Sequence, residues 1–399
     1  MKQFATSLLV LIATTFAAHG QHTLRPDAFP PEPEPPVAKA VTMATTIDEM
    51  ASWDRYPTYD VYVEMMSRFA INYPEICRLD TIGFSVDNRM ILCAVIHSRH
   101  LTQVVHPEFF YSSTMHGDEV TGFYFMLRLI DTLLRGYGVD SLLTNLVNEV
   151  VIYINPLANP DGTYRSGNST INGSTRYNAN GVDLNRNYPD PFGIEAEDPL
   201  QLENQAMMDY VGRHNFRMSA NLHGGAEVMN YPWDSFTSNE RQHPDWMWWE
   251  AVGRRYVDSV RAVAPTMFRT RGGVTAGGDW YVISNGRQDW MNFYANCREM
   301  TIEVSTAKTL ANNKLNTYWN AQYRSLVGYI QEIFNCPTAN VSVSAPTSGS
   351  GRIKVGPNPT TGVVTVETES GSHRIDLSDR PSGLHVITID GRPIKVIKL

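Results

Sequence analysis

The chain has 399 residues, enough for an enzyme-sized domain, and 42% hydrophobic with 19% charged residues indicates a mostly globular protein. A formal net charge of −8 at pH 7 offers no basic surface for nucleic acid, so we expect no nucleic-acid partner. Beyond the N-terminal region no run of about 18 apolar residues occurs, so we expect no transmembrane segment in the mature protein.

The first twenty residues follow the pattern of a secretory signal peptide. Lys2 precedes a mostly apolar run, Phe4–Ala18, and small residues suit cleavage after Gly20. Residues 21–42 are rich in Pro and acidic side chains, which favours an extended linker over a core. The sequence therefore predicts an exported protein, secreted or held at the cell surface, whose folded part starts near Met43.

Apolar strand-like runs alternate with amphipathic stretches through residues 43–335. The pattern predicts a helix and four strands at the positions that matter most: helix Val120–Leu134 and strands Val105–Met115, Val150–Ile154, Arg217–Leu222 and Met300–Val304. Such alternation is typical of one α/β domain with a central mixed, mostly parallel sheet flanked by helices. Ligands of such sheets bind beyond the carboxyl ends of the strands, so polar residues there are expected to converge.

His116 and Glu119 lie three residues apart at the first strand-to-helix junction, so both can reach one ion from the same turn. An isolated pair of this kind is usually two surface residues. His223, at the end of another predicted strand and followed by two glycines, supplies a third ligand. Two histidines and one glutamate form a catalytic zinc set with a position left for water, so we predict one Zn²⁺ per chain.

Glu303 is an acidic residue within an otherwise apolar strand. Exposure on an edge strand is one explanation. The other is catalysis, because a carboxylate beside an activated water can take its proton and pass it to a leaving amine. With the metal motif nearby, we predict that Glu303 is the general base.

Six motifs follow one another in a fixed order: HGDE (116–119), NPDG (159–162), DLNRNYPD (183–190), NLHGGAEVMNYPWD (221–234), GGDWY (277–281) and TIEVS (301–305). Through them, roughly residues 45–335 resemble the zinc metallocarboxypeptidases, most closely the regulatory branch related to carboxypeptidases N, E and D. The resemblance implies a zinc-dependent exopeptidase that hydrolyses the C-terminal peptide bond of peptides or proteins.

The resemblance gives roles to two further residues around the metal. It implies that Arg176 polarises the scissile carbonyl and holds the oxyanion, and that Asp183 accepts the other ring N–H of His116 and fixes its tautomer. Taken alone, an arginine in a polar loop is usually solvated.

An exopeptidase must also recognise a terminal carboxylate. Asn185 and Arg186 offer an amide and a guanidinium fork for it. Tyr281 resembles the mobile tyrosine that closes over the carboxylate, although a tyrosine beside Trp280 is more often simply packed.

Two residues bear on the preferred substrate. Asp234, eleven residues after His223, stands where the regulatory branch carries the acid that selects Lys or Arg, and Gln288 matches the branch's Gln in the same pocket. The resemblance thus implies a preference for basic C-terminal residues. Where the regulatory branch has the motif GGMQD, this chain has NGRQD (285–289). We expect that Arg287, near an acidic pocket, could screen or neutralise Asp234.

The region after the main domain divides into a linker, 336–355, and a small β module, 356–399. It is too short for the transthyretin-like β-sandwich that follows the catalytic domain in the regulatory branch. GPNPTTGVVTV, DRPSGLHVITI and the final KVIKL resemble the C-terminal sorting domain of the Bacteroidetes type IX secretion route. This implies secretion machinery as a partner and a tail that is removed on export or anchors the enzyme.

Three questions stay open at the level of sequence. Cys77, Cys93, Cys297 and Cys336 permit two disulfides in three possible pairings, or free thiols. The same architecture could serve a deacylase or amidase, which the set of Asn185, Arg186 and Tyr281 argues against. It could also serve a catalytically silent peptide-binding module, which the intact ligands and Glu303 argue against.

Overall fold

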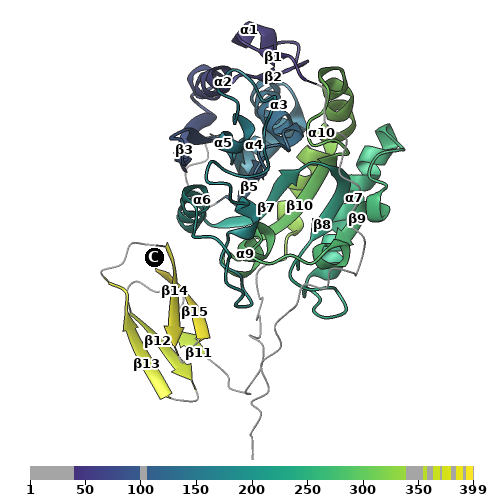
Figure 1. Cartoon of the computed structure of the whole chain (residues 1–399). Helices are drawn as coiled ribbons and strands as arrows, with labels where there is room; N and C mark the ends of the chain where they lie inside the picture. Colours follow the sequence, from purple (N-terminus) through teal and green to yellow (C-terminus); the bar gives the residue numbers. More distant parts are fainter. Residues whose placement is uncertain are drawn as a thin grey trace, which may run out of the picture. The chain divides into compact units, whose positions relative to one another are not determined.

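The computed structural model describes residues 40–98, 106–337, 354–356, 363–368, 371–378, 383–389 and 392–398. The signal peptide predicted for residues 1–20, almost all of the Pro-rich linker and most of the second linker lie outside these residues. The main domain, up to residue 337, and the C-terminal β module are described separately (Figure 1).

The main domain contains strands β1 to β10 and helices α1 to α10. The strands are β1 (Met43–Ala44), β2 (Tyr56–Pro57), β3 (Cys77–Phe84), β4 (Met90–Ile96), β5 (Glu108–Ser113), β6 (Val151–Asn155), β7 (Phe216–His223), β8 (Ala226–Tyr231), β9 (Val274–Ala276) and β10 (Arg298–Ser305). The helices are α1 (Ile47–Met50), α2 (Tyr59–Asn72), α3 (Thr121–Gly136), α4 (Ser141–Glu149), α5 (Pro160–Thr163), α6 (Leu202–Gly212), α7 (Trp246–Val263), α8 (Gly277–Trp280), α9 (Arg287–Phe293) and α10 (Leu315–Gln331). Single turns of 3₁₀ helix are η1 (Leu184–Arg186), η2 (Thr270–Gly273), η3 (Asn312–Lys314) and η4 (Glu332–Asn335).

Eight strands form one sheet in the order β3-β4-β6-β5-β7-β10-β8-β9. The central strands β6, β5, β7 and β10 run parallel, as do β8 and β9. Strand β4 pairs antiparallel with both β3 and β6, and β10 pairs antiparallel with β8. The predicted mixed sheet flanked by helices is confirmed. Parallel pairs dominate its centre, where the carboxyl ends of β5, β7 and β10 meet at one edge.

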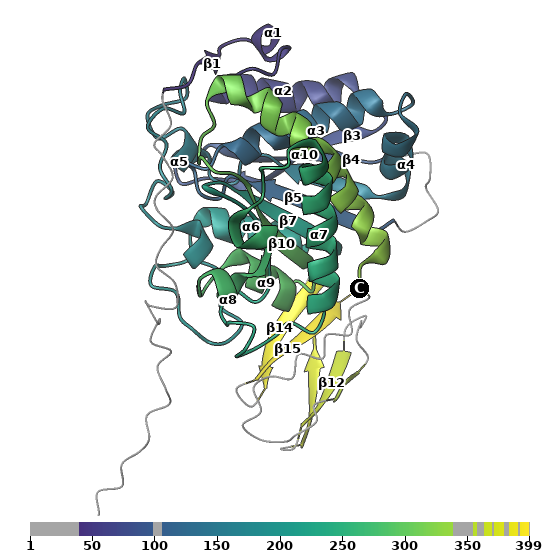
Figure 2. The ribbon, with the colours of Figure 1, turned by 90° about the vertical axis from the view of Figure 1, so that its right-hand side faces the viewer.

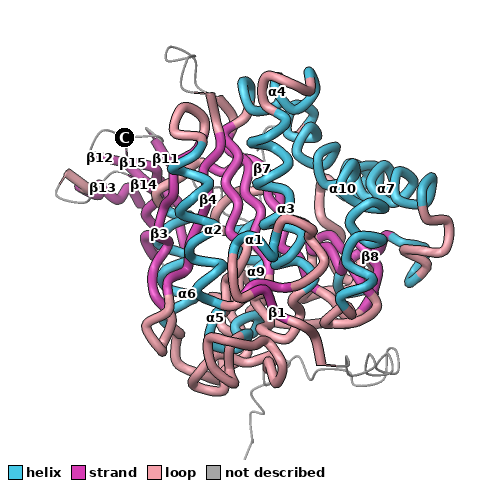
Figure 3. Tube along the Cα trace, turned by 90° about the horizontal axis from the view of Figure 1, so that it is seen from above, coloured by secondary structure: helices cyan, strands magenta, loops and turns pink. Residues whose placement is uncertain are grey.

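Side chains of the strands alternate between two apolar layers. In β4, Leu92, Ala94 and Ile96 face the larger layer, while Ile91, Cys93 and Val95 face the smaller one. Helices α2, α3, α7 and α10 cover the larger layer, and α6 and α9 cover the other. Figure 2 shows α7 and α10 in front of the central strands, and Figure 3 shows these two helices packed side by side. The sheet is therefore buried on both faces.

The predicted elements occur in the structure with shifted ends. The strand predicted for Val105–Met115 is β5, which ends at Ser113 because Thr114 has a left-handed backbone conformation, φ 59°. The turn that follows carries His116. The segment that follows β6 contains α5, which begins at Pro160 with Asn159 as its N-cap.

The four cysteines all lie within the described residues and are buried, and none of them is part of a disulfide. The two disulfides that the sequence permitted are therefore not formed. Cys93 and Cys297 instead pack as small apolar side chains in the layer covered by α6 and α9.

The C-terminal module consists of two small antiparallel sheets. The first contains β11 (Lys354–Gly356), β12 (Val363–Thr368) and β13 (Gly371–Asp376), and the second β14 (Gly383–Ile389) and β15 (Arg392–Lys398). Val364, Val366, Leu377 and Val396 form its buried cluster. Over the whole described chain, no helix has the length and apolar character needed to cross a membrane.

The packing of β5 can be tested with a buried and an exposed phenylalanine. Phe110 is 0% exposed and stacks on Phe216 at 4.8 Å between ring centroids, whereas Phe84 on β3 is 49% exposed. Phe110→Ala should lower the free energy of unfolding by about 3–5 kcal/mol, because it leaves a cavity in the core. Phe84→Ala should cost less than about 1 kcal/mol. Urea unfolding of both variants measures the difference, and equal losses would contradict the packing described.

Candidate metal centre and adjoining pocket

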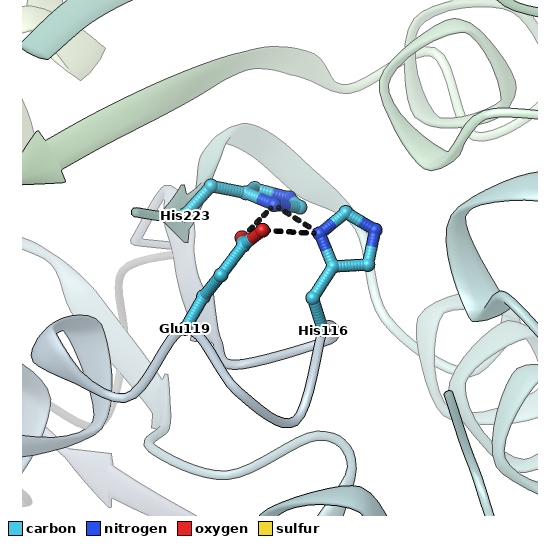
Figure 4. A group of neighbouring side chains, drawn as sticks. All are labelled: His116, Glu119 and His223. Atoms are coloured by element: carbon cyan, nitrogen blue, oxygen red, sulfur yellow. Dashed lines mark hydrogen bonds and ion pairs between the residues drawn. The ribbon is translucent and has the colours of Figure 1, made fainter. Parts of the chain in front are cut away.

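His116, Glu119 and His223 point toward one another at the carboxyl ends of β5 and β7 (Figure 4). His116 and Glu119 lie in the turn between β5 and α3, and His223 is the last residue of β7. Nδ1 of His116 lies 3.0 Å from Glu119 Oε1, and Nδ1 of His223 lies 2.8 Å from Glu119 Oε2. The two Nδ1 atoms are 3.0 Å apart, and each side chain is at most 5% exposed. The sequence-predicted ligand set is thus brought together.

The turn that carries His116 is held by the NPDG segment. A Cβ added at Gly117 would collide with the backbone of Gly162 and Thr163, so only glycine fits there. Thr163 Oγ1 donates to the Gly117 carbonyl at 2.9 Å, and Asn159 Nδ2 donates to the Met115 carbonyl at 3.1 Å. The NPDG motif was recognised from sequence, but the role of Asn159 was not; the signal for it is an N-cap residue directly before a proline.

Asp183 and Arg176 surround His116. Nε2 of His116 lies 3.2 Å from Asp183 Oδ1, while Arg176 Nε donates to Asp183 Oδ2 at 2.8 Å. Arg176 Nη1 also lies 3.1 Å from His116 Nδ1, and its side chain is 25% exposed, so it is engaged rather than solvated. Burial alone would raise the pKa of Asp183, but His116 and Arg176 hold it below its usual range.

Glu303 stands beside His223 through the register of two parallel strands. The two residues are Cα partners in the pairing of β10 with β7. Because β10 lies between β7 and β8, and Glu303 is 7% exposed, the edge-strand explanation for this residue does not hold. A buried carboxylate therefore lies beside the candidate ligand His223.

The donor set fits a zinc ion. Burial would raise the pKa of Glu119, but the neighbouring His116 and His223 hold it well below its usual range, so the carboxylate is ionised. With Nε2 of His116 directed at Asp183, its Nδ1 keeps a lone pair toward the shared space. Two imidazole nitrogens and one carboxylate are borderline-soft donors that zinc accepts.

Asn185 and Arg186 lie in η1, directly after Asp183. The backbone N–H of Asn185 donates to Asp183 Oδ1 at 2.9 Å, so this pair is tied to the candidate metal centre. Arg186 Nη1 donates to the Asn185 carbonyl at 2.8 Å. Tyr281 follows α8 and is 48% exposed, in contrast to the buried ligands.

Asp234 and Gln288 form a buried pair next to Asn185. Gln288 Nε2 donates to Asp234 Oδ1 at 2.7 Å. A Cβ added at Gly286 would lie 3.7 Å from both Asn185 Oδ1 and Asp234 Oδ2, so these polar groups line one space. Burial, together with the nearby charge of Asp289, raises the pKa of Asp234 well above its usual range.

The expectation that Arg287 could neutralise Asp234 is wrong. The Arg287 guanidinium is fully buried and contacts Glu299, with Nε 3.0 Å from Oε1. Because this guanidinium is paired with Glu299, it does not neutralise Asp234. Glu299 could not be identified from sequence as the partner of Arg287, because Arg287 lies on α9 and Glu299 on β10.

Comparison with known proteins adds independent observations. A family model described as zinc carboxypeptidase matches residues 62–325. Carboxypeptidase D of Mus musculus is 35% identical over 298 residues, covering 70% of this chain and 21% of that protein. Carboxypeptidase M of Mus musculus is 33% identical over 300 residues, covering 70% of this chain and 66% of that protein. This chain thus spans about a fifth of the length of carboxypeptidase D.

The fold has a solved counterpart. The crystal structure of thrombin activatable fibrinolysis inhibitor superposes with a TM-score of 0.64 at 17% sequence identity, covering 73% of this chain and 77% of that one. At this identity the likeness shows the fold alone.

The close approach of the HGDE and NPDG segments can be tested at Gly117. Gly117→Ala should lower the free energy of unfolding by about 1–3 kcal/mol and weaken zinc binding, because the backbone must shift. Gly328→Ala is the matched control: nothing lies within 4 Å of its added Cβ in α10. That change should stabilise the helix slightly and leave zinc binding unaltered. Calorimetric zinc titration and urea unfolding measure both; unchanged zinc affinity in Gly117→Ala would contradict the arrangement.

Proposed function

Because the chain belongs to the zinc carboxypeptidase family, we propose that it is an exopeptidase that hydrolyses the C-terminal peptide bond of peptides or proteins. The observation that carries this proposal is the convergence of His116, Glu119 and His223 beside the buried Glu303. We assign the activity to residues 43–335.

His116, Glu119 and His223 would hold one zinc ion. When bound, the ion supplies Lewis-acid activation of water and of the scissile carbonyl. Asp183 accepts from Nε2 of His116 and so keeps Nδ1 available as a ligand. The orientation of the His116 ring is thereby set by a residue of the chain itself.

Glu303 acts as the general base. Its carboxylate takes a proton from the attacking water and later gives it to the nitrogen of the leaving amino acid. Arg176 directs N–H groups toward the centre, within 3.1 Å of His116 Nδ1, and would donate to the oxyanion that develops on the carbonyl.

Asn185 and Arg186 bind the terminal carboxylate of the substrate. A guanidinium fork and an amide N–H₂ match the two oxygens of a carboxylate, and the hydrogen bond from Asn185 to Asp183 links them to the residue that contacts His116. Tyr281, which is 48% exposed, would close over the same group. An amidated chain end lacks this carboxylate and would be rejected.

Asp234, with Gln288, selects a basic side chain. Support comes from the buried carboxyl group of Asp234, which Arg287 does not neutralise because it is paired with Glu299 instead. A Lys or Arg side chain entering the pocket would find one buried acid and one amide.

The N-terminal segment and the C-terminal module would handle export. Residues 1–20 have the composition of a signal peptide, and the β module at 356–399 resembles a type IX sorting domain. In this proposal the enzyme acts outside the cell or at its surface.

Two variants separate chemistry from metal binding. Glu303→Gln should lower turnover by about 10²–10⁴-fold, because the amide cannot take a proton, yet it should keep stoichiometric zinc. His223→Ala should lose both. Peptide turnover and metal content of the purified proteins are the measurements, and retained turnover in Glu303→Gln would refute the assigned base.

The pocket acid should impose a pH dependence on specificity. Because the pKa of Asp234 is raised, its carboxylate ionises only as pH increases, so the preference for C-terminal Lys over Leu should increase with pH. Asp234→Asn should remove that trend and lower kcat/KM for the Lys peptide about 10–100-fold, the loss of a hydrogen bond between charged groups. The exposed Asp258→Asn on α7 is the control. A Lys preference that persists in Asp234→Asn would exclude this pocket.

A further inference from the structure

Arg287 is a charged side chain placed at the start of α9 and yet only 1% exposed. Its Nε lies 3.0 Å from Glu299 Oε1 and its Nη2 lies 3.1 Å from Glu299 Oε2. The ring of Phe110 lies 5.2 Å from the guanidinium. A two-point contact with a buried carboxylate fixes the orientation of both side chains.

Glu299 is itself anchored in the sheet. Its carboxylate accepts from Ser219 Oγ at 2.8 Å and from Asn221 Nδ2 at 3.0 Å, both on β7. Glu299 precedes Glu303 by four residues on β10, and Ser219 precedes His223 by four on β7. The anchor thus belongs to the two strands that carry the general base and a metal ligand.

The backbone of Arg287 reaches the proposed carboxylate site. Its N–H donates to Asn185 Oδ1 at 2.9 Å. A backbone N–H can only donate, so this bond determines which end of the Asn185 amide is the oxygen and directs Nδ2 elsewhere. An Asn185 oriented this way retains its N–H₂ group for a carboxylate ligand.

The next two residues of α9 complete the same pocket. Gln288 donates to Asp234 Oδ1, and Asp289 accepts from the backbone N–H groups of Asp234 and Ser235 at 2.8 and 2.9 Å. A shift of the start of α9 would therefore disturb both the carboxylate site and the side-chain pocket.

We propose that Arg287 is a positioning residue for substrate recognition: its buried ion pair with Glu299 locks the start of α9 and so holds Asn185 in the orientation that donates to the terminal carboxylate. The inference rests on the proposed function. It assigns Arg287 no contact with substrate or metal.

The test compares Arg287→Met, the double variant Arg287→Met/Glu299→Gln and the control Arg255→Met. Arg255 pairs with Glu332 on the surface, Nε to Oε1 2.6 Å, so the control loses an ion pair away from the pocket. Steady-state kinetics on a peptide ending in Lys, zinc content and the thermal midpoint are measured for each. Arg287→Met should raise KM about tenfold with kcat changed less than about twofold, at full zinc content. Arg255→Met should leave KM and kcat at wild-type values.

The double variant distinguishes positioning from stability. It leaves no unpaired buried charge, so its thermal midpoint should recover toward wild type, whereas its KM should stay raised because the anchor is still missing. Should Arg287→Met fail to fold, the double variant carries the test alone. Recovery of wild-type KM in the double variant, or unchanged KM in Arg287→Met, would overturn the inference. Zinc-loaded wild-type protein that releases no residue would instead overturn the proposed function, and this inference with it.

Discussion

Glu119 presents one carboxylate oxygen to His116 and the other to His223, in a space almost closed to water. Burying an ionised carboxylate beside imidazole nitrogens that carry lone pairs is unfavourable, unless a cation or hydrogen-bond donors compensate for the negative charge. The surrounding contacts meet that constraint by holding the three side chains in position: the NPDG segment supports the turn, and Asp183 orients the ring of His116. Without a metal ion this arrangement of side chains is unfavourable for the free energy of folding. The same arrangement suits a zinc ion, which would compensate for the buried charge.

The sheet sets the distances between the parts of the site. The register of β7 with β10 places Glu303 next to His223, and four residues earlier it places Glu299 next to Ser219. One end of this strand pair therefore carries Glu303 and the candidate ligand His223, and the other contacts α9 through Arg287. The carboxylate site and the pocket acid are linked to the metal centre through backbone contacts from Asn185 and α9.

The central elements and the metal set could be predicted from sequence because their signals are local. Buried strands leave apolar runs, and a histidine or glutamate at a strand end is conspicuous there. The role of Asn159 and the Arg287–Glu299 pair could not be predicted, because they depend on which segments meet in space. Glu299 lies twelve residues from Arg287 on a different element, so no spacing rule joins them. The state of the cysteines could not be predicted either, since an even count of cysteines is compatible with disulfides and with thiols.

We propose that the site cleaves at a free chain terminus with the help of a bound metal. The most direct measurement uses one peptide ending in Lys in two forms, free acid and amide, incubated with untreated, chelator-treated and zinc-restored protein. Loss of a single C-terminal Lys from the acid form alone, abolished by the chelator and restored by zinc, is the predicted result. Equal cleavage of the amidated peptide, or cleavage of the acid that persists after the metal has been removed, would contradict it.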